Sequence, residues 1–177
     1  MANTRKGLVV SCSYPRSDHE LEAPENDALF YERLLKNFGF SVRRLSDLKL
    51  GLQSSHRGNI LRSVEWLIQD AKRGDNLAFV FSGHGLCTTC TSSERRDELD
   101  RALLAAELEE PFPANLLFDS ELQSLFGLLP AGVLVTCIID DPCGDRVLRL
   151  PWYYDAKTRW CSPGHSHGAK CALSLYI

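Results

Sequence analysis

Two kinds of hydrophobic pattern alternate along the chain. Short runs of consecutive apolar residues are typical of strands buried on both faces of a sheet. Longer stretches with an apolar residue every three or four positions are typical of amphipathic helices. The sequence predicts strands of the first kind at residues 7–13, 77–81 and 133–139, and helices at residues 26–38, 58–73 and 120–129. Polar and apolar residues alternate in segment 40–45, which predicts a further strand there.

The order of these elements predicts the fold. Gly39 and Gly74 follow the first two helices, as glycine often does at a helix C-terminus. Ser120 and Gln123 have the spacing of a capping box at the start of the third helix. Strict alternation of strand and helix indicates right-handed crossovers around a parallel sheet. We therefore expect an α/β three-layer sandwich with a mainly parallel sheet.

Composition and charge limit the kinds of partner that this protein is expected to bind. Of the 177 residues, 44% are hydrophobic and 24% are charged, as in ordinary globular domains. The net charge of −3 gives no general attraction to nucleic acid or to an anionic membrane. No apolar segment has the form of a signal peptide or the length of a membrane span. We expect a cytoplasmic protein with no nucleic-acid or membrane partner.

The seven cysteines are expected to be free thiols, because their number is odd and no export signal precedes them. Cys12 and Cys137 stand inside apolar runs and are expected in the core. Cys87 and Cys90 form a C-x-x-C pair, which raises the alternative of a zinc or redox module. A second pair at metal spacing is missing, since the remaining candidates are scattered: Cys161, His165, His167 and Cys171. We therefore expect polar loop cysteines and no metal site.

Reactive side chains follow two of the predicted strands. His84 stands between glycines in "FSGHG", directly after the third strand. Asp140, Asp141 and Cys143 follow the fourth strand in "IIDDPCGD". Active groups in an open parallel sheet collect at the carboxyl ends of strands. A thiol and an imidazole on neighbouring strand ends are the minimum for a cysteine nucleophile with a general base.

Several segments carry a resemblance to caspase-type peptidases, most closely the metacaspases. "GNILRSVEWLIQDAKRGDNLAFVFSGHG" resembles the family's helix, strand and histidine motif, and "APENDALFYERLLKNFGF" resembles its early Asn-Asp-Ala helix. "FDSELQSLFGLLPAGVLVTCIIDD" and "VLRLPWYYD" are similar to the two flanks of its cysteine motif. The resemblance extends from Gly7 to Tyr154 and keeps the family's motif order.

The resemblance implies a cysteine endopeptidase with His84 and Cys143 as its catalytic dyad. It also implies cleavage after Arg or Lys, with Asp27 and Asp140 as the two carboxylates of the substrate pocket and Gly85 in the oxyanion loop. A buried cationic side chain needs such partners to offset its desolvation. For Asp27 alone, a favourable position near a helix N-terminus is an equally good explanation.

The cysteine motif departs from the family pattern. Alignment without gaps places Pro142 at the nucleophile position and Cys143 where the family has histidine. A one-residue slip restores Cys143 as the nucleophile but shifts it by up to about 3.8 Å, and catalysis tolerates errors nearer 1 Å. We favour the ungapped alignment and impaired activity, and expect an electrophilic arginine peptide to label the protein weakly or not at all.

The calcium site that the resemblance implies also departs from the family pattern. Arg149 stands where the family has an Asp in Leu-Asp-Leu-Pro-Tyr, so a cation occupies part of the calcium site. Asp97, Glu98 and Asp100 resemble the acidic loop that would supply other ligands, although a solvated charged loop explains them equally well. We expect no cofactor.

The family's smaller C-terminal portion has no recognisable match in this chain. We assign residues 1–154 to a caspase-like domain of the larger-subunit type and leave residues 155–177 unassigned. The missing portion leaves an exposed sheet edge, which favours association with another chain or aggregation. Two functions remain open: a peptidase acting on polypeptides at Arg or Lys, and an inactive homologue acting through a caspase-like partner chain.

Overall fold

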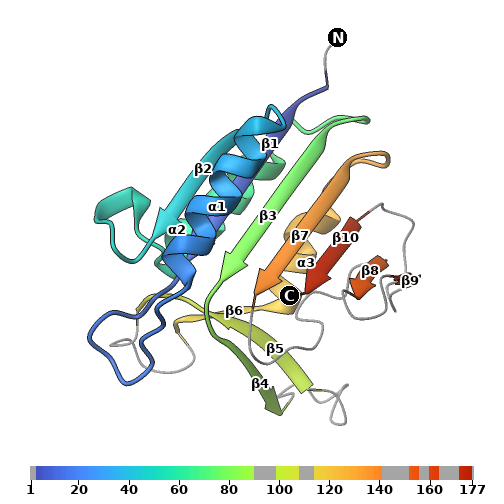
Figure 1. The fold of residues 1–177 in the computed structure, drawn as a ribbon. Coiled ribbons are helices and arrows are strands. Elements are labelled where there is room, and N and C mark those ends of the chain that lie inside the picture. Colours follow the sequence, from blue (N-terminus) through green and yellow to red (C-terminus); the bar gives the residue numbers. More distant parts are fainter. Residues whose placement is uncertain are drawn as a thin grey trace.

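The computed structural model contains a large, mainly parallel sheet covered by helices on both faces, as Figure 1 shows. It describes residues 3–89, 99–107 and 114–140, and three short strands after them. The large sheet has seven strands in the order β2-β1-β3-β7-β10-β8-β9. Every pair of neighbours is parallel except β8 and β9. Its strands are β1 (Arg5–Ser11), β2 (Ser41–Ser46), β3 (Asn76–Ser82), β7 (Leu134–Asp140), β8 (Trp152–Asp155), β9 (Trp160–Pro163) and β10 (Ala172–Tyr176).

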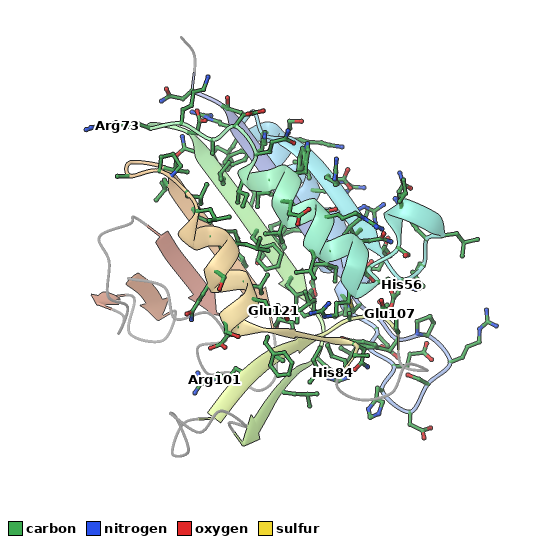
Figure 2. The ribbon with its side chains drawn as sticks, turned by 180° about the vertical axis from the view of Figure 1, so that it is seen from behind. His56, Arg73, His84, Arg101, Glu107 and Glu121 are labelled. Carbon is green, nitrogen blue, oxygen red and sulfur yellow. The ribbon has the colours of Figure 1, made fainter. Side chains whose placement is uncertain are left out.

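Three α-helices complete the layers. Helix α1 (Pro24–Asn37) covers one face of the sheet, while α2 (Arg57–Ile68) and α3 (Asp119–Gly127) cover the other (Figures 1 and 2). Successive residues of β1 and β3 point to opposite faces and are buried on both, which explains their continuous apolar runs. The expected three-layer α/β sandwich is therefore confirmed.

A smaller antiparallel sheet lies beyond the carboxyl ends of β3 and β7. It consists of β4 (Gly85–Thr89), β5 (Leu99–Leu104) and β6 (Leu116–Phe118), with β5 in the middle. The sequence analysis did not predict these strands. A short 3-10 helix, η1 (Gly51–Gln53), lies between β2 and α2.

Two sequence-based predictions about helix ends are wrong. Helix α2 ends at Ile68 and not near Gly74, because Asp70 adopts a left-handed backbone conformation with φ of 58°. Aspartate tolerates this conformation better than most residues, and it ends the helix as a glycine would. Helix α3 begins at Asp119, and the Glu121 carboxylate, not Gln123, accepts a hydrogen bond from the backbone N–H of Phe118 at 3.1 Å.

The sheet also continues beyond the fourth predicted strand. Strand β10 pairs in parallel with β7 along its length and separates it from β8. Strand β7 is therefore not an edge strand, and part of residues 155–177 lies within the sheet. Hydrophobic periodicity is hard to recognise there because these strands have only four or five residues. None of the helices in the described ranges is long and apolar enough to span a membrane.

Candidate active site

The candidate site lies where β1, β3 and β7 end. Strands β3 and β7 are direct neighbours, with Ser82 opposite Asp140. The backbone N–H of Gly83 donates a hydrogen bond to the Asp140 carbonyl at 3.2 Å, so this contact continues one residue past β3. His84 therefore follows a strand that lies beside the one leading to Cys143, with no strand between them. A Cys–His pair requires that its two residues follow neighbouring strands, and β3 and β7 are such neighbours.

The His84 imidazole has a defined hydrogen-bonding state. Its Nε2 atom lies 2.9 Å from the backbone carbonyl of His19. A carbonyl only accepts, so Nε2 carries the proton and the neutral ring has its lone pair on Nδ1. The ring also stacks on Tyr14, with centroids 5.1 Å apart and an angle of 25°. These contacts fix the ring and leave Nδ1 to act as a base.

Tyr14 holds the backbone around this histidine. Its buried hydroxyl donates to the Leu104 carbonyl at 2.7 Å and accepts the backbone N–H of His84 at 3.0 Å. Burial raises the pKa of the Tyr14 hydroxyl above its usual range, so this group keeps its proton and its donor role. The hydroxyl thus joins the turn after β3 to the end of β5.

Two local features explain the shape of this turn. A Cβ atom at Gly83 would lie 3.0 Å from the Tyr14 hydroxyl and 3.1 Å from the Phe81 ring, so the close approach favours glycine. Tyr14 itself has a positive φ of 51°, which is uncommon for a bulky residue. Its backbone N–H donates to the Asp47 carboxylate at 2.6 Å, which helps to hold this conformation.

The two predicted pocket carboxylates lie on adjacent elements beside the histidine turn. Asp27 is in the first turn of α1 and accepts a hydrogen bond from the Ser82 hydroxyl at 3.1 Å. Asp140 ends β7, opposite the same serine. Burial raises the pKa of Tyr31 and the charges of Asp140 and Asp27 raise it further, so both carboxylates lie within electrostatic range of the Tyr31 hydroxyl. The structure therefore brings Asp27 and Asp140 together.

Of the remaining predicted site residues, the structure describes Gly85 but not Cys143. Gly85 begins β4 directly after His84, opposite Leu103. Cys143 and Pro142 lie outside the described residues, and so does Arg149. Chain length still limits the position of Cys143: three residue steps from Asp140 allow at most about 11 Å between Cα atoms.

The described side chains contain no group of three or more His, Cys, Asp or Glu residues that would hold a metal ion. Of the C-x-x-C pair, Cys87 lies in β4 and Cys90 is outside the described residues. Cys12 and Cys137 are free and buried as expected, and burial raises the pKa of both thiols, which disfavours reactive thiolates.

Tyr14, His19 and Ser82 belong to the site but were not predicted. Tyr14 and His19 lie 70 and 65 positions before His84 in the sequence, so no local pattern relates them to it. For Ser82 a signal was present: it is the one hydroxyl in "FVFSGHG", at the end of an apolar strand.

Comparisons with known proteins show which proteins this chain is similar to. A family model described as "Metacaspase, peptidase C14 domain" matches residues 5–151. Metacaspase-1 of Saccharomyces cerevisiae strain S288c is 28% identical over 159 residues, covering 86% of this chain and 36% of the relative. Metacaspase-1 of Candida albicans is 29% identical over 163 residues, covering 86% and 36%. The chain thus spans just over a third of the length of these relatives.

A solved structure supports the architecture alone. Protein GSU0716 from Geobacter sulfurreducens superimposes with a TM-score of 0.63 at 23% sequence identity. The match covers 78% of this chain and 50% of that chain.

Proposed function

This chain belongs to the metacaspase family of C14 peptidases, and from this premise we propose that its site cleaves polypeptides slowly after Arg or Lys. Cys143 is the proposed nucleophile and His84 the proposed general base. The observation that carries the proposal is the hydrogen bond between His84 Nε2 and the His19 carbonyl. It leaves Nδ1 as a proton acceptor on the strand end beside β7, which leads to Cys143.

The proposed reaction has two steps. In the first, Nδ1 of His84 takes the thiol proton while the sulfur of Cys143 attacks the carbonyl carbon of the scissile bond. The same proton then passes to the leaving amine as the C–N bond breaks, which leaves a thioester. In the second step, His84 takes a proton from water as the hydroxide attacks the thioester, and it gives this proton to the sulfur as the C–S bond breaks, which restores the thiol and the neutral imidazole. The products are a carboxylic acid and an amine.

Selectivity for Arg or Lys is supported by the paired carboxylates Asp27 and Asp140. Like charges held close together repel each other, and a guanidinium or ammonium group between them would relieve that repulsion. The Ser82 hydroxyl, which donates to Asp27, fixes one of the two carboxylates. We propose that the Arg or Lys side chain before the scissile bond enters between them.

A second function is favoured by one specific observation. The ungapped alignment places Pro142 at the nucleophile position, and proline has no nucleophilic group. In this alternative the domain binds Arg- or Lys-containing segments of another protein at Asp27 and Asp140 but does not cleave them. The caspase-like partner chain expected from the sequence would be one such protein.

Thiol labelling distinguishes the two functions. The probe is a peptide chloromethyl ketone with a terminal arginine, and intact-mass spectrometry followed by peptide mapping identifies the labelled cysteine. The slow peptidase predicts labelling at Cys143 over hours, which the His84→Ala variant abolishes. Rapid labelling at Cys143 would contradict impaired activity, and no labelling together with measurable binding of an arginine peptide would support the non-catalytic alternative.

Cellular location forms a separate proposal. Cys12 and Cys137 are both free thiols, which agrees with a reducing compartment such as the cytoplasm. Fractionation of cells that produce the tagged full-length protein tests this location.

A further inference from the structure

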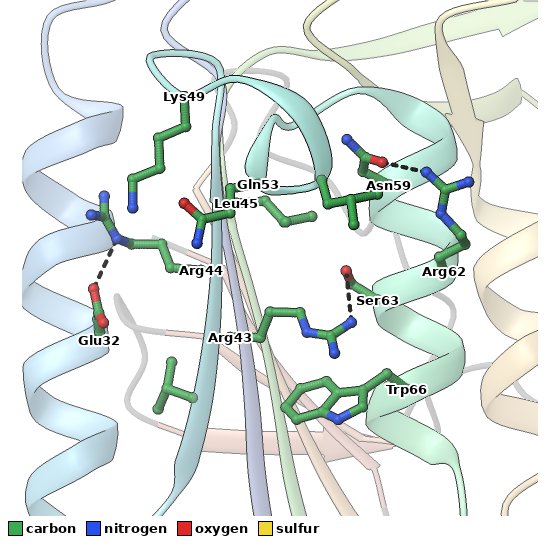
Figure 3. Close-up of a pocket in the computed structure, with 12 residues that line it drawn as sticks. Glu32, Arg43, Arg44, Leu45, Lys49, Gln53, Asn59, Arg62, Ser63 and Trp66 are labelled. Carbon is green, nitrogen blue, oxygen red and sulfur yellow. Dashed lines mark hydrogen bonds and ion pairs between the residues drawn. The ribbon is translucent and has the colours of Figure 1, made fainter.

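A groove runs along the outer edge of β2, away from the candidate active site. Figure 3 looks onto this edge, with α1 on one side and α2 on the other. The groove has a volume of about 630 Å³, and residues of β2, α1, α2 and the segment 49–53 line it. No strand pairs with the outer edge of β2 in the part of the chain that the structure describes.

The groove is basic although the chain is acidic. Its lining includes four cations, Arg43, Arg44, Lys49 and Arg62, and one carboxylate, Glu32. The whole chain has a net charge of −3. This local reversal of sign favours an anionic ligand.

Not all of these cations are neutralised by the protein. Arg44 forms ion pairs with Glu25 at 2.5 Å and with Glu32 at 2.8 Å. Arg43 and Arg62 have no carboxylate partner among the described residues. Two guanidinium groups are therefore free to pair with carboxylates of a ligand.

These two arginines are held by neutral neighbours. Arg43 lies over the Trp66 ring at 4.3 Å from its centroid and donates to the Ser63 hydroxyl at 3.4 Å. Arg62 donates to the Asn59 side-chain carbonyl at 2.5 Å. Such contacts orient a guanidinium without cancelling its charge.

Apolar side chains flank the groove. Leu48, Leu50 and Leu52 follow β2 and are 56%, 94% and 78% exposed. Leu52 also lines the groove itself. A ligand with apolar as well as acidic side chains would cover them, and exposed leucines gathered in one place often mark an interaction surface.

We propose that this groove binds an extended acidic segment of a partner protein, which adds to the sheet as a strand beside β2. Its backbone pairs with the free edge of β2, its carboxylates pair with Arg43 and Arg62, and its apolar side chains cover Leu52. An anionic membrane would use the same charges but would not use the strand edge between the two helices. The surface shares no residue with the candidate active site, so the proposal does not depend on peptidase activity.

The test measures binding of a fluorescent peptide with alternating Glu and Leu residues by fluorescence anisotropy. The full chain is expected to bind it, and the double variant Arg43→Glu, Arg62→Glu is expected to bind at least about tenfold more weakly. Arg73→Glu is the matched control, because Arg73 is exposed and does not line the groove. Its affinity is expected to stay within about twofold of the original protein.

Two further binding measurements test whether the peptide pairs as a strand and whether its binding is independent of the candidate active site. A peptide of the same sequence with alternate backbone amides N-methylated loses its strand hydrogen bonds and is expected to bind at least about tenfold more weakly. The His84→Ala variant is expected to bind the unmodified peptide normally, which separates this proposal from the peptidase.

Any one of the following results would overturn the proposal. They are binding that survives the double arginine variant, equal binding of a Lys–Leu peptide, and binding only to phosphatidylserine vesicles. Failure of the Glu–Leu peptide to bind the original protein at all would also overturn it.

Discussion

His84 is oriented by groups that come from distant parts of the chain. The His19 carbonyl fixes its tautomer, the Tyr14 ring stacks on it, and the Tyr14 hydroxyl holds its backbone N–H. Each contact is local in space but separated by at least 65 positions in sequence. The chemistry of the histidine therefore depends on residues that are not themselves reactive.

The Tyr14→Phe variant tests this dependence. It removes one hydroxyl and leaves the Leu104 carbonyl and the His84 N–H without that partner, so we expect unfolding to become easier by about 1–3 kcal/mol. The histidine turn should also loosen, which should lower kcat/KM by about tenfold. Urea denaturation and peptide hydrolysis measure the two effects.

Tyr31→Phe is the matched control for stability, because no hydrogen bond to a described protein group is assigned to that hydroxyl. Its free energy of unfolding is expected to stay within about 0.5 kcal/mol of the original protein. Equal stability of the Tyr14→Phe and Tyr31→Phe variants would contradict the role given to Tyr14.

At the scale of elements, Glu25 joins α1 to two strands. Its carboxylate accepts hydrogen bonds from Ser46 at 2.8 Å, Arg44 at 2.5 Å and Ser11 at 3.0 Å. Partial burial alone would raise the pKa of Glu25, but the hydrogen bonds from Ser46, Arg44 and Ser11 outweigh it and lower the pKa below 4.5. The ionised form is therefore the one that fastens α1 to β1 and β2.

Replacement of the Glu25 carboxylate should lower the free energy of unfolding by an amount that depends on pH. Because the folded pKa is lowered, the stabilisation is present above the ordinary value of 4.5 and is lost as the pH falls through the folded pKa. We expect Glu25→Gln to lower the free energy of unfolding by about 1–3 kcal/mol near pH 7. The difference should shrink steadily at acidic pH.

Urea denaturation between about pH 7 and about pH 3 measures this dependence. Glu65→Gln serves as control, since Glu65 is exposed on α2 and its side chain has no ion pair among the described residues. A constant stability difference across the pH range for Glu25→Gln would contradict the assignment.

The elements also show how much of the fold the sequence predicts. The strands β1, β3 and β7 were predicted because both faces of the sheet are covered, which leaves long apolar runs such as Leu77 to Phe81. Strand β2 was predicted from the alternation of polar and apolar residues in segment 40–45. Strands β4–β6 and β8–β10 were not, because they are short and their pairing is set by distant partners. The end of α2 was misplaced because a single aspartate, Asp70, takes the conformation usually given to glycine.

The candidate site was predictable to a similar degree. His84, Asp27 and Asp140 could be named from their motifs, and the structure places them on neighbouring elements at one end of the sheet. The partners that orient them could not, because a backbone carbonyl such as that of His19 has no sequence signature.

At the scale of the whole molecule, the C-terminal strands complete the sheet. Strand β10 covers the edge of β7 over five residue pairs, and β8 pairs in turn with β10. The end of the chain is thus part of the layer that carries Asp140.

A chain cut after Asp155 tests this contribution. It lacks β9 and β10, so β7 is exposed and β8 has no neighbour left. We expect Tm to fall by about 10 °C and the protein to associate through the open edge. Thermal unfolding and size-exclusion chromatography with light scattering measure both effects, and a monomer of unchanged Tm would show that these strands add nothing to the sheet.

We propose that two neighbouring strand ends supply the catalytic pair of a cysteine peptidase. The most direct measurement is the rate at which the full chain hydrolyses a fluorogenic peptide ending in arginine, compared with its Cys143→Ala and His84→Ala variants. We predict slow cleavage by the original protein and none by either variant. Cleavage that persists in Cys143→Ala, or no cleavage by the original protein at any concentration, would contradict the claim.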